Sequence, residues 1–140
     1  MNLAHVAITV KDMDAALRFY EEGLGFKRAF DMPEPETGEP WIVYVYAGNG
    51  QFVELFYGGE KDYSWDPKDR AYNHVCIGTD DIHKSTARLQ EAGYTMDILP
   101  KLGCDGNWQA WVTDPDGVRI ELMQISETSP QMEAVRRFEG

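Results

Sequence analysis

Two histidines and two glutamates recur at matching positions in this sequence, and side chains of these types bind divalent metal ions. His5 precedes Glu54 by 49 residues, and His74 precedes Glu121 by 47 residues. Imidazole nitrogens and carboxylate oxygens are good ligands for Ni, Zn, Co, Mn or Fe. A metal that selects thiolate ligands would not prefer this set. Two carboxylates would neutralise a divalent ion, and an octahedral ion would keep two adjacent positions for neighbouring oxygens of a substrate. The four residues therefore predict a site that holds one divalent metal ion.

The sequence around the two pairs repeats, which predicts two copies of one structural unit. The strand-like segment 5–10 reappears as 74–79. Each copy is followed by an aspartate, Asp12 or Asp81, of the kind that caps a helix. Further on, each half carries an Asn-Gly or Asp-Gly hairpin signal whose glycine lies four residues before the glutamate. The two pairs are thus expected at equivalent places in two modules.

Each half is expected to form a strand, a helix and then three strands. Apolar residues at helical spacing place the helices at 13–24 and 82–92. The expected strands are 3–10, 26–31, 41–47, 51–57, 72–79, 94–99, 108–113 and 118–124. The predicted fold class is α+β, with two tandem βαβββ modules that form a cup-shaped sheet around the metal site.

The polar, turn-rich stretch between the two halves is interpreted as a linker. The expected organisation is a single domain 1–125, with modules 3–57 and 72–124 and linker 58–71, followed by a helical tail 126–140. Residues 31–40 and 100–107, which are rich in Pro or Gly, are expected to be loops. Ser129-Pro130 marks the start of the helix in the tail, because proline is tolerated at the first helical position.

Strand alternation directs both histidines and both glutamates to the sheet face that the helix does not cover. The same face carries further candidate substrate-binding residues, which are Tyr44, Phe52, Phe56, Trp111 and Arg119. Arg119 would either anchor an anionic group of the substrate or form a salt bridge at the rim. Cys76 shares this face as a packing residue, whereas His83 has no counterpart in the repeat and is expected at the surface.

The composition is that of a globular protein whose acidic surface does not favour binding to polyanions. The chain has 140 residues, with 24 Asp and Glu against 13 Lys and Arg, and a net charge of −11. This balance argues against nucleic acid and anionic membranes as partners, because phosphate binding needs a basic surface. The longest apolar run, 41–47, is too short to span a bilayer, and the N-terminus lacks a basic signal region. Two cysteines make no disulfide framework, so a cytoplasmic location is expected.

The ordered repeat, together with the Asp-Pro-Asp-Gly turn at 114–117, resembles the vicinal oxygen chelate superfamily of glyoxalase, bleomycin-resistance and extradiol-dioxygenase proteins. The resemblance covers residues 3–124 and implies paired βαβββ modules. Within the superfamily, the His/Glu/His/Glu set looks most like glyoxalase I (lactoylglutathione lyase) and its relatives. Extradiol dioxygenases and fosfomycin-modifying transferases instead use two His and one Glu, with another His at the position of Glu54.

The resemblance implies a metal-dependent isomerase or lyase that acts through an enediolate on a small substrate with vicinal oxygens. Such a reaction needs a base for the proton beside the carbonyl. The matching glutamate of glyoxalase I is assigned as this base, so Glu121 is the first candidate and Glu54 is the pseudo-symmetric alternative. Members of the fold often pair modules across chains, which implies a homodimer with the metal site within one chain or across two.

Two other functions stay open at this point. An Fe(II) ring-cleaving dioxygenase needs two histidines and one carboxylate with open metal positions, and the extra Glu54 argues against it. A non-enzymatic protein that binds small molecules, such as a drug-sequestering resistance protein, needs no metal quartet. The intact quartet therefore favours the lyase or isomerase over both.

Two positions depart from the pattern of glyoxalase I. That family usually has an arginine four residues after the first histidine ligand, where this chain has Thr9. It usually has an asparagine four residues after the first glutamate ligand, where this chain has Gly58. Both family residues help to hold glutathione. Their replacement predicts weak activity on substrates carried by glutathione, while the metal chemistry is left intact.

Overall fold

The computed structural model of the protein describes residues 3–140, which fold into two compact units. The first unit is Met1–Tyr63 and the second is Ser64–Gly140. Each unit contains its own four-stranded sheet and at least one helix. The predicted α+β fold class with two modules is confirmed.

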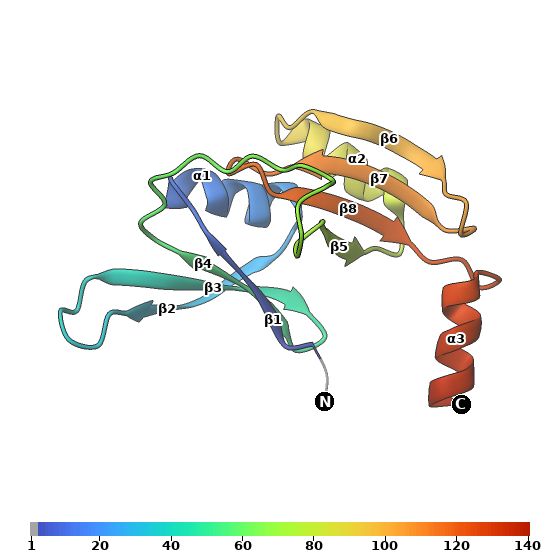
Figure 1. Ribbon diagram of the computed structural model, residues 1–140, viewed down its shortest axis with the longest axis horizontal. Helices are drawn as coiled ribbons and strands as arrows, with labels where there is room; N and C mark the ends of the chain where they lie inside the picture. Colours follow the sequence, from blue (N-terminus) through green and yellow to red (C-terminus); the bar gives the residue numbers. More distant parts are fainter. Residues whose placement is uncertain (1–2) are drawn as a thin grey trace. The chain divides into compact units, whose positions relative to one another are not determined.

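The first unit begins with the strand that carries one of the histidines. Its elements are β1 (His5–Thr9), α1 (Met13–Leu17), the π-helix η1 (Arg18–Gly23), β2 (Lys27–Pro33), β3 (Pro40–Gly48) and β4 (Gln51–Phe56). The strand order is β1-β4-β3-β2 (Figure 1). Strand β1 runs parallel to β4, and the other pairs are antiparallel. The first strand therefore lies directly beside the strand that carries the glutamate.

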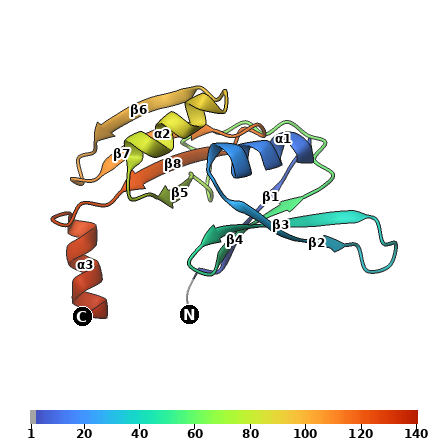
Figure 2. The ribbon, with the colours of Figure 1, turned by 180° about the vertical axis from the view of Figure 1, so that it is seen from behind.

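The second unit repeats this plan. Its elements are β5 (Val75–Gly78), α2 (Ile82–Glu91), β6 (Met96–Leu102), β7 (Trp108–Thr113), β8 (Arg119–Gln124) and α3 (Pro130–Glu139). The strand order β5-β8-β7-β6 matches that of the first unit, and β5 runs parallel to β8. Helix α2 packs on β6, β7 and β8 and covers one face of the sheet (Figure 2).

The helix starts follow the predicted capping rule in both units. The Asp12 side chain accepts a hydrogen bond from the backbone N–H of Ala15 at 3.0 Å, and the Asp81 side chain accepts one from Lys84 at 3.0 Å. Each aspartate thereby satisfies an otherwise unpaired N–H group in the first helical turn. The residues that cap the two helices are thus equivalent in the two modules.

Most element ends differ from the sequence prediction by one or two residues, and the differences in four elements are notable. The helix expected at 13–24 is α-helical only to Leu17 and then widens into η1. Strands β2 and β6 continue to Pro33 and Leu102, into stretches expected to be loops, because pairing with β3 and β7 satisfies their backbone groups. Strand β5 begins at Val75, so His74 lies immediately before it rather than within it.

Among residues 3–140, no helix is long and apolar enough to cross a membrane.

A buried asparagine ties the C-terminal tail to the second sheet. Asn107 is fully buried, and its Oδ1 accepts a hydrogen bond from the backbone N–H of Ser126 at 2.9 Å. Its Nδ2 donates to Asp105 Oδ2 at 2.9 Å and to Gln131 Oε1 at 3.2 Å. One side chain thus joins the start of β7 to the end of β8 and to α3.

Replacement of Asn107 by Leu is expected to lower the free energy of unfolding by about 1–3 kcal/mol, because the partly buried backbone N–H of Ser126 loses its acceptor. Chemical denaturation, followed by circular dichroism, measures this loss. Replacement of Gln131 by Ala is the control, since Gln131 is exposed and supplies only the longest of the three contacts. An equal loss in both variants would show that the Ser126 contact is not the important one.

Candidate functional site

The first histidine and the first glutamate lie together on the sheet of the first unit. In the parallel pairing of β1 with β4, Ala7 is opposite Glu54, and His5 lies two residues before Ala7 on the same face. His5 Nδ1 is 3.4 Å from Glu54 Oε1. The predicted alternation therefore does bring these two side chains into contact.

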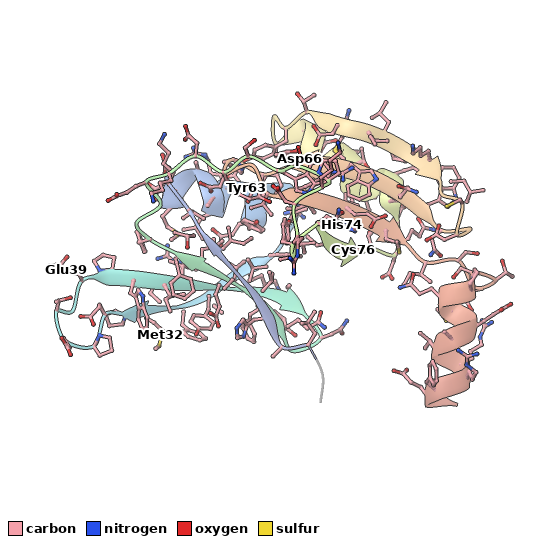
Figure 3. All side chains as sticks on the ribbon, viewed as in Figure 1. Met32, Glu39, Tyr63, Asp66, His74 and Cys76 are labelled. Atoms are coloured by element: carbon pink, nitrogen blue, oxygen red, sulfur yellow. The ribbon has the colours of Figure 1, made fainter. Side chains whose placement is uncertain are left out.

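The second unit brings its histidine and glutamate together at the equivalent place, but through the other ring nitrogen. In the pairing of β5 with β8, Cys76 is opposite Glu121, and His74 lies two residues before Cys76. His74 Nε2 is 3.0 Å from Glu121 Oε2. Figure 3 shows His74 and Cys76 close together at β5. The equivalence inferred from sequence spacing thus extends to the strand register.

A neighbouring amide orients the second histidine. His74 Nδ1 lies 2.7 Å from Asn73 Oδ1, so the amide oxygen can accept the Nδ1 proton. A hydrogen bond at Nδ1 leaves the Nε2 lone pair directed to the other side of the ring. His74 therefore has the arrangement common among metal-binding histidines.

The two glutamates are so deeply buried that each carboxylate needs a cationic partner, such as a metal ion. Glu54 is 7% exposed and Glu121 is 6% exposed. Glutamate is rarely buried so deeply unless it is paired, because removing a carboxylate from water is costly. The two carboxylates and two imidazoles form a donor set that suits a divalent ion, with nitrogen and oxygen ligands and a charge that matches. The pair in each unit, one imidazole and one carboxylate, is therefore of the kind that binds a divalent ion.

Each glutamate also has a second polar neighbour from the adjacent strand. Tyr44 is opposite Glu54 in the pairing of β3 with β4. Burial, a hydrogen bond to Glu54 and the charge of that carboxylate raise the pKa of Tyr44. Burial of the thiol, followed by the charge of Glu121 and a hydrogen bond to it, raises the pKa of Cys76 to about 12. Tyr44 and Cys76 are therefore protonated at neutral pH and can donate to the two carboxylates.

Aromatic side chains surround the first pair. Tyr44 and Phe52, both predicted to bind substrate, are in ring contact with centroids 6.2 Å apart. Two residues that sequence reasoning missed join them: Phe30 stacks on Tyr44 at 4.3 Å, and Tyr46 lies 5.4 Å from Phe52. Phe56 contacts Trp41 instead, with centroids 5.9 Å apart. The alternation of β3 would have identified Tyr46, whereas Phe30 depends on the pairing of β2.

The second pair is bordered by an indole and a guanidinium group. Trp111 is opposite Glu121 in the sheet, and its ring centroid lies 4.8 Å from that of His74. The Arg119 guanidinium carbon lies 4.1 Å from the Trp111 ring centroid and 4.4 Å from that of Trp65. Trp65 belongs to the stretch predicted to be only a linker. The signal in the sequence that could have identified it is the presence of one Trp among polar residues.

The third histidine lies on the helix of the second unit and contacts neither glutamate of the two pairs. His83 is exposed on α2, where its ring contacts Trp108 with centroids 5.4 Å apart. Within residues 3–140, no group of three or more His, Cys, Asp or Glu side chains is gathered as a metal cluster, and each unit supplies its own pair. The binding of one ion by all four residues stays a prediction.

Comparisons with known proteins agree with the fold and the repeat. The model of the Glyoxalase/Bleomycin resistance protein/Dioxygenase superfamily matches residues 2–122. A probable lactoylglutathione lyase of Vibrio parahaemolyticus is 31% identical over 136 residues, which cover 94% of this chain and 96% of that protein. The lactoylglutathione lyase of Haemophilus influenzae is 29% identical over 133 residues, which cover 91% of this chain and 96% of that protein.

A solved structure shows the same architecture. The crystal structure of a glyoxalase family protein from Enterococcus faecalis superposes with a TM-score of 0.71 at 26% sequence identity. The superposition covers 87% of this chain and 96% of that one. With a family model that spans nearly the whole chain and relatives of matching length, the chain belongs to the glyoxalase/bleomycin resistance protein/dioxygenase superfamily.

Proposed function

We propose that the protein is a metal-dependent lyase or isomerase, similar to lactoylglutathione lyase, that acts on a small substrate with vicinal oxygens. The observation that carries this proposal is the His–Glu pair that recurs at the same register position in each unit. His5, Glu54, His74 and Glu121 are the proposed ligands of one divalent ion. Ni, Zn, Co, Mn and Fe all suit these ligands.

The bound ion would supply Lewis acidity toward a substrate carbonyl. Glu121 is the proposed base that takes the proton from the carbon beside that carbonyl, which turns the substrate into an enediolate. Glu54 is held by the Tyr44 hydroxyl and is the pseudo-symmetric alternative base. Phe52 and Trp111 would contact the body of the substrate and exclude water from it.

Metal analysis of the protein as purified tests the proposal. About one divalent ion per chain is expected, with binding weakened in His5→Gln and His74→Gln. His83→Gln is the matched control, because His83 lies exposed on α2 and its ring contacts Trp108 rather than a glutamate. Loss of metal in the control, or full retention of metal in both ligand variants, would contradict the proposed ligand set.

Loss of the hydrogen bond between Asn73 and His74 is expected to weaken metal binding. Replacement of Asn73 by Ala should lower the affinity by about 10- to 100-fold, the usual cost of removing a partner of a metal-binding histidine. Asn73→Asp keeps an acceptor oxygen and should retain most of the affinity. Competition with a chromophoric chelator measures both values. Equal weakening by the two substitutions would mean that the acceptor oxygen is not what orients the ring.

Binding without catalysis is the second candidate. The aromatic group of Phe30, Tyr44, Tyr46 and Phe52 favours it, because such rings bind planar small molecules whether or not a metal is present. The metal analysis separates the two functions. A metal-free protein that binds aromatic compounds with undiminished affinity would favour the binding protein.

We also propose that the protein forms a homodimer, as members of this fold often do. Light scattering at micromolar concentration should give about twice the chain mass of 15.9 kDa, and a mass equal to one chain would refute the dimer. Cys76 and Cys104 are free thiols, which favours a reducing compartment such as the cytoplasm.

A further inference from the structure

We propose that Arg119, together with Trp65 and Trp111, binds a carboxylate group of the substrate. This inference rests on the proposed function, because it names the class of substrate that the site would accept. The substrate would then carry its vicinal oxygens at one end and a carboxylate a short distance away. Trp65 becomes a residue of the binding site rather than part of a passive linker.

Two indole rings hold the Arg119 side chain in place. Its guanidinium carbon lies over the Trp111 ring at 4.1 Å and over the Trp65 ring at 4.4 Å. Contacts of this kind attract a cation to the face of the ring and displace water from it. The Trp111 ring is itself fixed, since its Nε1–H donates to Gln109 Oε1 at 2.8 Å. The guanidinium is therefore positioned before any ligand arrives.

The segment that carries Trp65 is fastened to the same strand. The Tyr72 hydroxyl donates a hydrogen bond to the backbone carbonyl of Arg119 at 2.9 Å. In Figure 1 the segment that leads into β5 passes beside β8, in agreement with this bond. The position of Trp65 over Arg119 is thus supported by a second contact further along the segment.

The N–H groups of Arg119 have no partner in the part of the chain that the structure describes. No carboxylate of residues 3–140 forms an ion pair with Arg119, and no hydrogen bond runs from its guanidinium to the protein. Arg28 and Arg136, by contrast, pair with Asp31 and Glu127. In a chain with 24 acidic and 13 basic residues, an arginine held by rings and left without an acid is suited to an external anion.

Arg119 lies close to Glu121 and His74, so an anion bound to it would be near the proposed reactive groups. Arg119 lies two residues before Glu121 on β8, so the two side chains share a sheet face at a Cα separation of roughly 7 Å. Trp111, which contacts the guanidinium, also contacts the His74 ring. An anion on Arg119 would therefore lie a few bonds from atoms held at His74 and Glu121.

A carboxylate fits this arrangement better than a phosphate. A guanidinium presents two parallel N–H groups that match the two oxygens of a carboxylate. The single positive charge of Arg119 balances one carboxylate, whereas a phosphate dianion would keep an unmatched charge beside the buried Glu121. The experiment therefore also includes a phosphonate analogue, which carries up to two negative charges, to test a phosphate-like group.

The experiment compares two probes that differ only in the anionic group. These are 3,4-dihydroxybenzoate and its neutral amide, 3,4-dihydroxybenzamide, which share the same vicinal oxygens. Both are titrated into metal-loaded and metal-free protein, with calorimetry and tryptophan fluorescence as readouts. Wild-type protein should bind the acid about 10- to 100-fold more tightly than the amide, as expected for a charge-assisted bidentate contact.

Variants identify the residues responsible for this preference. Arg119→Gln should remove the preference for the acid, because it weakens binding of the acid far more than binding of the amide. Trp65→Leu should reduce the preference, whereas Trp65→Phe, which keeps an aromatic face, should retain most of it. Arg136→Gln is the control for loss of one positive charge, since Arg136 lies on α3 and pairs with Glu127.

The outcomes separate this inference from the proposed function. Absence of metal from the purified protein would refute the proposed metal-dependent reaction. The ratio of acid to amide affinity, measured in metal-free protein, would still test whether Arg119 binds a carboxylate. Equal binding of acid and amide, or a preference that survives in Arg119→Gln, would overturn the inference. Tighter binding of 3,4-dihydroxybenzylphosphonate than of the acid, lost in Arg119→Gln, would overturn the carboxylate class in favour of phosphate.

Discussion

Replacement of Glu121 by Gln is expected to lower turnover by on the order of 10²–10⁴, the usual contribution of a general base. The glutamine side chain has the same shape and its amide N–H can donate to His74 Nε2, so the fold should persist. Its neutral amide cannot accept the substrate proton. Incorporation of solvent deuterium into dihydroxyacetone, followed by NMR at saturating metal, measures the proton removal itself.

The equivalent substitution in the first unit gives the decisive comparison. Glu54→Gln should weaken metal binding but cost less turnover once metal is saturating. The structural reason is that the Tyr44 hydroxyl already occupies an acceptor position of Glu54, whereas the neighbour of Glu121 is the weaker S–H donor of Cys76. Glu91→Gln, on the exposed end of α2, is the control. Equal losses in the Glu54 and Glu121 variants would remove the assignment of Glu121 as sole base.

Weak activity on the glutathione hemithioacetal of methylglyoxal is the second large effect expected. Its kcat/KM should lie below about 10⁴ M⁻¹s⁻¹, at least two orders of magnitude under the roughly 10⁶–10⁸ M⁻¹s⁻¹ of a well-evolved enzyme. Thr9 and Gly58 stand where the glyoxalase I pattern has the arginine and asparagine that hold glutathione. Assays with Ni, Co, Zn and Mn should compare this adduct with thiol-free 2-oxoaldehydes and α-hydroxycarbonyls.

The structure locates both departures at one end of the first sheet. Thr9 is the last residue of β1 and pairs with Phe56 of β4, and Gly58 follows two residues later. Gly58 has a φ of 91°, a conformation that asparagine tolerates better than most residues, and a Cβ there would meet no neighbour within 4 Å. Position 58 therefore has open space for an asparagine side chain, at the cost of some backbone strain, and Thr9 is exposed.

The double variant Thr9→Arg with Gly58→Asn is thus expected to raise kcat/KM for the glutathione adduct by about tenfold or more, through one charge-assisted contact. Activity on the thiol-free substrates should not change. Efficient turnover of the adduct by the unmodified protein would show that Thr9 and Gly58 do not limit glutathione binding. This result would place the chain closer to the lactoylglutathione lyases that it resembles.

The sequence alone indicated that both histidines and both glutamates belong to one face of the strands. The repeat placed one histidine and one glutamate in each half, and strand alternation gave their shared face, because the side-chain period of a strand is a local property. The two-module plan and the aspartate caps of both helices followed in the same way. These features depend on the spacing of residues along the chain, which the sequence gives without any structure. The contacts of His5 with Glu54 and of His74 with Glu121 came from the strand register.

Contacts between distant segments could be read only from the folded structure. The contact of Phe30 with Tyr44 depends on the register of β2 on β3, and the contact of Trp65 with Arg119 depends on the path of a segment without regular structure. The burial of Asn107 depends on how the C-terminal tail returns to β7. Local propensity does not specify such non-local contacts, because they form only when remote parts of the chain pack together.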